Sequence, residues 1–136
     1  MNTSVSPASL TFLQKLRENN NKDWMQEHKK EYQASEASLK ELYAEILKGV
    51  SVLDEIEKQK NFRINRDVRF SKNKTPYNSH RSVSWSRLGA HRRGSYYLRI
   101  EPGMCAIGGG FFGPEPKDLL RIRKEFEMDS DEIRAI

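Results

Sequence analysis

Basic side chains gather in a short stretch near the middle of the chain, and their chemistry is suited to binding an anion. Between residues 63 and 74 a single acid, Asp67, accompanies five basic residues: Arg63, Arg66, Arg69, Lys72 and Lys74. The guanidinium fork of arginine matches two oxygens of a phosphate or carboxylate, and lysine adds a mobile point charge. Asp67 is placed to orient the guanidiniums of Arg63 and Arg69, and Tyr77 adds a wall or a hydroxyl donor. The pattern predicts that an anionic small molecule, such as a phosphate-bearing ligand, binds at a basic strand and loop over residues 63–81.

The charge distribution supports this prediction. Residues 61–100 contain ten basic residues and one acid, a net charge of +9, although the whole chain carries only +5. One acid cannot neutralise ten cations locally, so positive potential is concentrated in this part of the chain. The alternative is that the arginines form ion pairs with acids of the N-terminal helices, which would make the segment a structural or interaction element. The acids considered for that role are Glu36, Glu41 and Glu45.

His80 raises a second hypothesis, that of an enzyme. It follows the basic loop directly and could exchange a proton with a bound phosphorylated or carboxylated substrate, as could Asp67. No serine in a nucleophile-elbow pattern accompanies it. A surface histidine without a chemical role fits the same position, so the sequence supports no particular reaction.

Other signals for metals, cofactors and membranes are absent from the sequence. No histidine has a partner at metal-binding spacing, and Cys105 is the only cysteine, so we expect no metal site, no cofactor and no internal disulfide. The Gly108–Gly110 run lacks the Gly-Lys-Ser/Thr ending of a phosphate loop. No stretch approaches the ~20 apolar residues of a membrane span, and the start does not read as a secretory signal. We therefore expect a cytoplasmic protein with no membrane partner.

Nucleic acid is a further candidate partner because aromatic and basic residues alternate on neighbouring predicted strands. Trp85, Tyr96 and Tyr97 lie near Arg87 and Arg99, an arrangement that can stack bases. In a strand, however, Tyr97 shares a face with Arg99, whereas Tyr96 faces the opposite side. At most one of these tyrosines can therefore lie on the solvent side, and aromatic residues of sheets more often belong to the core. Nucleic acid is thus less favoured than a small anion.

Hydrophobic periodicity predicts helices, then strands, then a helix. A helix is expected over residues 6–19, and a second helical stretch over 23–50 with a break near Ala34 and Ser35. Alternation of apolar and polar residues predicts a strand over 62–70, followed by a loop over 71–79. Further strands are expected over 82–88, 96–100 and 104–108, with a final helix from Pro116. This order indicates an α+β fold in which helices pack on a roughly four-stranded antiparallel meander.

The run from Arg66 to Tyr77 resembles the signature of family twenty-four sixty-one of the numbered domains of unknown function, conserved hypothetical proteins of bacteria and fungi. Asn19, Asn20 and Trp24, the Tyr96–Leu98 strand and the Gly108–Gly110 run with Pro114 fit the same family. The chain departs from it at Met25, Asn73 and Asn78. The resemblance implies an α+β fold and no activity. Residues 1–136 are expected to form a single domain, and because family members continue beyond the position of Ile136, the chain resembles a shortened member or the N-terminal part of a longer domain.

Overall fold

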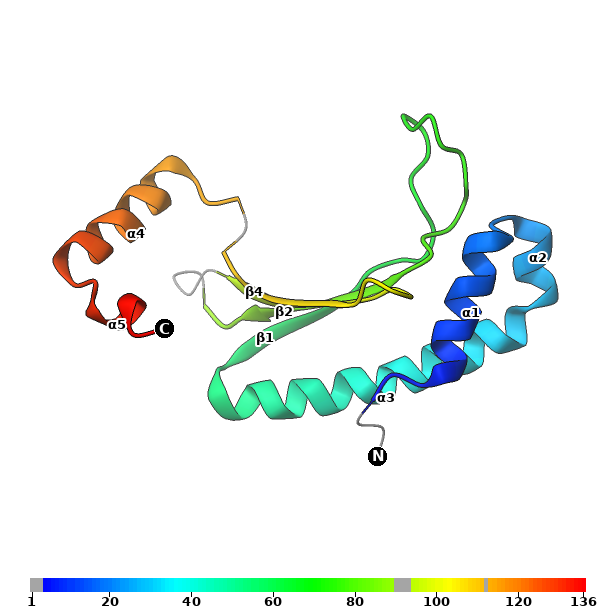
Figure 1. The fold of residues 1–136 in the computed structure, drawn as a ribbon, viewed down its shortest axis with the longest axis horizontal. Coiled ribbons are helices and arrows are strands. Elements are labelled where there is room, and N and C mark those ends of the chain that lie inside the picture. The colour runs from blue at the N-terminus through cyan, green and yellow to red at the C-terminus, as the bar shows by residue number, and fades with distance from the viewer. Residues whose placement is uncertain (1–3, 90–93, 112) are drawn as a thin grey trace.

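The computed structural model describes residues 4–89, 94–111 and 113–136. Its elements follow the predicted order of helices, then strands, then a helix, with a short additional helix, α5, at the end, and this order confirms the α+β class (Figure 1). In chain order they are α1 (Pro7–Glu18), α2 (Lys22–Glu27), α3 (Lys29–Leu53), β1 (Ile56–Asn61), β2 (Arg81–Arg87), β3 (Ser95–Ile100), β4 (Ala106–Gly110), α4 (Pro116–Met128) and α5 (Asp131–Arg134).

The N-terminal helices begin at residues that satisfy their free amides. The Ser6 hydroxyl accepts a hydrogen bond from the Ser9 amide at 3.2 Å, and Pro7 stands at the first helical position. The predicted break at Ala34 and Ser35 is wrong, because α2 ends and α3 begins at His28, whose backbone leaves the helical conformation. Ser35 is instead buried, as is Ser9 of α1.

The sheet has the strand order β1-β2-β3-β4 with antiparallel neighbours, so the predicted meander is confirmed. The predicted first strand over 62–70 is wrong, because β1 lies earlier, at Ile56–Asn61. Residues 62–80 form the connection from β1 to β2, which we call the β1–β2 loop, and only an isolated bridge joins Asn65 to Tyr77 within it. The alternation of apolar and polar residues did not correspond to a strand here. Ile64 is buried, but Phe70, which the pattern places on the same face, is 94 % exposed.

One face of the sheet lies on α3 and the other is open (Figure 1). Val83, Trp85 and Ile100 point to α3, where the Trp85 ring meets Tyr43 edge to face at 6.4 Å. They belong to the core, which also includes Phe12, Leu13, Leu16, Leu39, Leu42 and Ile64. Because side chains alternate along a strand, the residues between them lie on the opposite, outer face. The register gives that face as Lys58, Lys60, Ser82, Ser84, Ser86, Ser95, Tyr97, Arg99, Ala106, Gly108 and Gly110.

Candidate functional site

The β1–β2 loop rises from the sheet on the side away from α3 (Figure 1). Its base is anchored by the Asn78 amide, which donates to the Ile64 carbonyl at 2.7 Å. The side chain of Asn20 makes two hydrogen bonds to the backbone of Tyr77, near the C-terminal end of the loop. It donates to the Tyr77 carbonyl at 2.8 Å and accepts from the Tyr77 amide at 3.1 Å. The polar run between α1 and α2 therefore fixes where the loop stands.

Arg66 holds the interior of the loop together. Its guanidinium donates to the Thr75 carbonyl at 2.9 Å and to the Thr75 hydroxyl at 2.7 Å. Longer bonds reach the Asn73 carbonyl at 3.3 Å and the Ser71 hydroxyl at 3.4 Å. Arg66 thus satisfies hydrogen-bond acceptors within a tight loop. This role explains why an arginine occupies a position that the predicted strand over residues 62–70 assigns to its apolar face.

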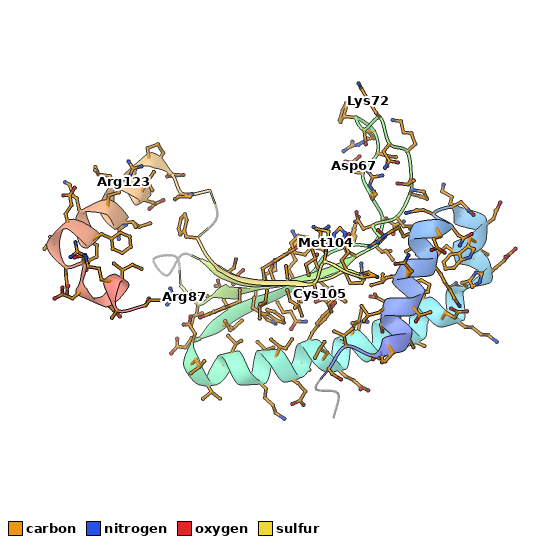
Figure 2. All side chains as sticks on the ribbon, viewed as in Figure 1. Asp67, Lys72, Arg87, Met104, Cys105 and Arg123 are labelled. Atoms are coloured by element: carbon orange, nitrogen blue, oxygen red, sulfur yellow. The ribbon has the colours of Figure 1, made fainter. Side chains whose placement is uncertain are left out.

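The other charges of the loop lie nearer its tip. Asp67 grips Arg69 with two bonds, from Nε to Oδ1 at 3.0 Å and from Nη2 to Oδ2 at 2.7 Å. This pairing lowers the pKa of Asp67 and raises that of Arg69. Lys74 donates to the Val68 carbonyl at 2.7 Å. Lys72 lies near the far end of the loop (Figure 2) and has no side-chain partner among the described residues.

A pocket of about 660 Å³ opens between the base of the loop and the outer face of the sheet. Its charged lining residues are Lys60, Arg63, Arg66 and Asp67, and His80 lines it as well. The remaining lining residues are Asn61, Phe62, Asn65, Asn78, Ser82 and Tyr97. Four of the predicted site residues therefore meet here: Arg63, Arg66, Asp67 and His80. The other four, Arg69, Lys72, Lys74 and Tyr77, do not line this pocket.

The pocket is positively charged. Arg63 is exposed, and its side chain has no ion-pair or hydrogen-bond partner among the described residues. The Lys60 ammonium sits 4.8 Å from the centroid of the Phe62 ring, a cation–π contact that leaves its charge unneutralised. Asp67, the one carboxylate that the described part of the chain contributes to the lining, already pairs with Arg69. Burial lowers the pKa of His80, the nearby Arg99 lowers it further, and Glu101 opposes this effect.

Several lining residues were not predicted as site residues. Among them, the sequence pattern pointed only to Tyr97, which alternation along the strand places on the same face as Arg99. The structure confirms that Tyr96 and Tyr97 point to opposite faces of the sheet. Tyr96 donates from its hydroxyl to Asp54 Oδ2 at 2.9 Å, whereas the Tyr97 hydroxyl lies 2.8 Å from Ser82 Oγ on the outer face. Nothing in the sequence marked Lys60 and Phe62 as site residues, because their position depends on where β1 ends.

Arginines on the sheet itself are paired with acids, but only Arg81 pairs with an acid within the N-terminal helices, as the structural hypothesis expected. Arg81 is buried and donates to Glu36 from Nε at 2.7 Å and from Nη2 at 3.0 Å. Arg87 meets Asp54 at 2.7 Å, and Arg99 meets Glu101 at 2.8 Å. Of the three helix acids considered, only Glu36 pairs with an arginine among the described residues, since Glu45 contacts Lys48 and Glu41 has no partner there. Arg92 and Arg93 lie outside the described residues.

Three further observations bear on the site. The Gly108–Gly110 run lies within β4, and Gly108 is opposite Tyr97 in the register. Within residues 4–89, 94–111 and 113–136, no group of three or more His, Cys, Asp or Glu residues could hold a metal ion. In the same ranges no helix has the length and apolarity that crossing a membrane requires.

Fold and pocket together define a class: an α+β fold in which N-terminal helices cover one face of an antiparallel meander and a basic loop overhangs the other. A sequence model of one protein family matches residues 8–136, and its description is "Conserved hypothetical protein (DUF2461)". The chain belongs to this family. No curated protein and no solved structure matches the chain.

Proposed function

We propose that the domain binds an anionic, phosphate-bearing ligand in the pocket below the β1–β2 loop. The observation that carries this proposal is that Arg63 and Lys60 line one pocket, where Arg63 has no partner among the described residues and the single carboxylate that these residues contribute, Asp67, is occupied by Arg69. A charge-assisted bond to phosphate would give Arg63 the partner that the described residues do not supply.

The predicted residues take different roles in this proposal. Arg63 and Lys60 contact the ligand, and His80 and the Tyr97 hydroxyl offer further donors at the wall. Arg66 shapes the loop and adds its charge to the field. Asp67 pairs with Arg69 rather than with Arg63, so it orients a guanidinium that does not line the pocket. Arg69, Lys72 and Lys74 raise the local potential without lining the pocket, and Tyr77 keeps the loop attached to Asn20.

The experiment compares two exposed cations of equal charge by isothermal titration calorimetry against inorganic phosphate and pyrophosphate. Arg63→Ala removes the lining cation, and Lys72→Ala is the matched control at the loop tip. Because a bond to a charged group contributes about 1.5–3 kcal/mol, we expect Arg63→Ala to weaken binding at least roughly tenfold. Lys72→Ala is expected to change affinity by less than about threefold, a screened surface effect. Equal losses in both variants, or no binding by the wild type, would overturn the proposal.

An enzymatic role is the second candidate, and one observation favours it. His80 lines the pocket, and burial lowers its pKa, which favours the neutral imidazole that a general base requires. Such a group can accept a proton from water attacking a phosphoester. The test is hydrolysis of p-nitrophenyl phosphate: His80→Gln should abolish turnover while retaining phosphate binding. Binding without turnover in the wild type would leave a binding domain.

The exposed free Cys105 is consistent with the reducing cytoplasm, where we place the protein.

A further inference from the structure

An aromatic wall stands next to the cations of the pocket. The rings of Phe62 and Tyr97 meet edge to face, with centroids 6.4 Å apart and an interplanar angle of 77°. Phe62 remains 38 % exposed, although a phenyl ring in this small domain would gain from burial. Both rings line the pocket together with Lys60 and Arg63. An inorganic anion would use the cations and leave this aromatic surface without a contact.

The sheet around Tyr97 leaves room for a planar group. The hydroxyl of Tyr97 reaches Ser82 on the neighbouring strand, so its ring is held across β2 rather than turned away from the sheet. Its register neighbours on the outer face are small, Ser84 on one side and Gly108 on the other. A Cβ added at Gly108 would meet no atom within 4 Å. The surface next to the ring is therefore open.

A hydrogen-bonding group also faces the pocket without a partner. Asn65 is exposed, lines the pocket, and its side-chain amide makes no hydrogen bond with any described residue. The neighbouring amides are occupied: Asn61 accepts from Gln59, and Asn78 donates to the Arg63 carbonyl. A carboxamide can both donate and accept, which suits the edge of a nucleobase.

We propose that the ligand of this pocket is a nucleotide, with its phosphate on Arg63 and Lys60 and its base stacked on Tyr97. The inference rests on the proposed anion binding and adds the class of ligand. Tyr97 provides the stacking surface and Asn65 bonds to the edge of the base. Stacking on an aromatic side chain tolerates any base, because each base has a π face.

The experiment titrates the full chain with AMP, adenosine and inorganic phosphate. We expect AMP to bind roughly tenfold more tightly than phosphate, as a stacked base provides. Tyr97→Leu should remove this preference by weakening AMP far more than phosphate, whereas Tyr97→Phe, which lacks the hydroxyl but keeps the ring, should retain the preference. Tyr96→Phe, on the α3 side, is the control and should behave as the wild type. Phe62→Leu is a second test of the wall should Tyr97→Leu fail to fold, and it should weaken AMP more than phosphate.

The outcomes separate the two proposals. Equal binding of AMP and phosphate, insensitive to Tyr97→Leu, overturns the nucleotide assignment and leaves anion binding intact. Absence of binding by AMP and phosphate alike overturns both. A short single-stranded oligonucleotide that binds far more tightly than AMP, through Lys58 as well as Tyr97, would overturn the single-nucleotide assignment in favour of a strand laid across the outer face.

Discussion

Arg66 is expected to control the local stability of the β1–β2 loop, and its removal can be worked through from the contacts. Arg66→Ala deletes two short bonds to Thr75, at 2.9 and 2.7 Å, and two longer ones. Because the side chain is half-buried, we count only the short bonds, at about 1.5 kcal/mol each, the low end for charged groups. The loss is about 3 kcal/mol, and at 1.36 kcal/mol per factor of ten it favours opening of the loop roughly 150-fold.

Native-state hydrogen exchange followed by NMR measures this opening directly. The reporters are the Arg66 amide, which donates to the Pro76 carbonyl at 2.9 Å, and the Asn78 amide, which donates to the Ile64 carbonyl at 2.7 Å. Both should exchange much faster in Arg66→Ala, while amides of β2 next to the buried Val83 keep their wild-type rates. Arg63→Ala is the matched control, since that exposed side chain has no partner among the described residues.

The reasoning would be refuted by unchanged exchange at the two reporters, which would mean that the loop is held by its backbone alone. Equal acceleration in the loop and in β2 would also contradict it, because the loop would then open only with the whole fold. If the prediction is correct, Arg66→Ala should also lose anion binding without Arg66 touching the ligand, and Arg66→Lys should restore little, since lysine lacks the fork.

Three further changes test other parts of the structure. Glu36→Ala should destabilise the domain by about 3 kcal/mol in urea unfolding, because it leaves Arg81 buried and uncompensated, and adding Arg81→Met should recover part of the loss. The pKa of His80 is lowered in the folded state, so the unfolded chain binds a proton first as pH falls below 6.5. The free energy of unfolding should therefore decrease below that pH, and His80→Gln should make it depend less on pH there. Gly94→Ala should cost about 1–3 kcal/mol, since its φ is +124° and the new Cβ would lie 3.3 Å from a carbonyl oxygen of β4. Gly108→Ala, in open space, should cost under about 1 kcal/mol, and equal thermal shifts for both glycine variants would contradict this explanation.

The sequence alone determined the class of fold, because periodicity is a local property. The leucines of α1 recur at helical spacing, and Ser6 with Pro7 marks its start, so the helix could be predicted within a residue or two of its bounds. The parity of Tyr96 and Tyr97 likewise follows from alternation along a strand, and it correctly separated the two rings. The prediction failed at residues 62–70, where alternation occurs without a partner strand. Pairing with β2 depends on a distant segment, and it placed β1 at Ile56–Asn61 instead.

Charge was also visible in the sequence, but its distribution in space was not. A net of +9 over residues 61–100 could mean an open cationic site or a network of internal ion pairs, and the same residues allow both. Tertiary structure divided them: Arg81 finds Glu36 forty-five positions away, Arg66 bonds to its own loop, and Arg63 is left facing a pocket. Ion pairs and pockets depend on which distant groups come within a few ångströms of each other. Residue types list the available partners, and only the folded chain decides which of them meet.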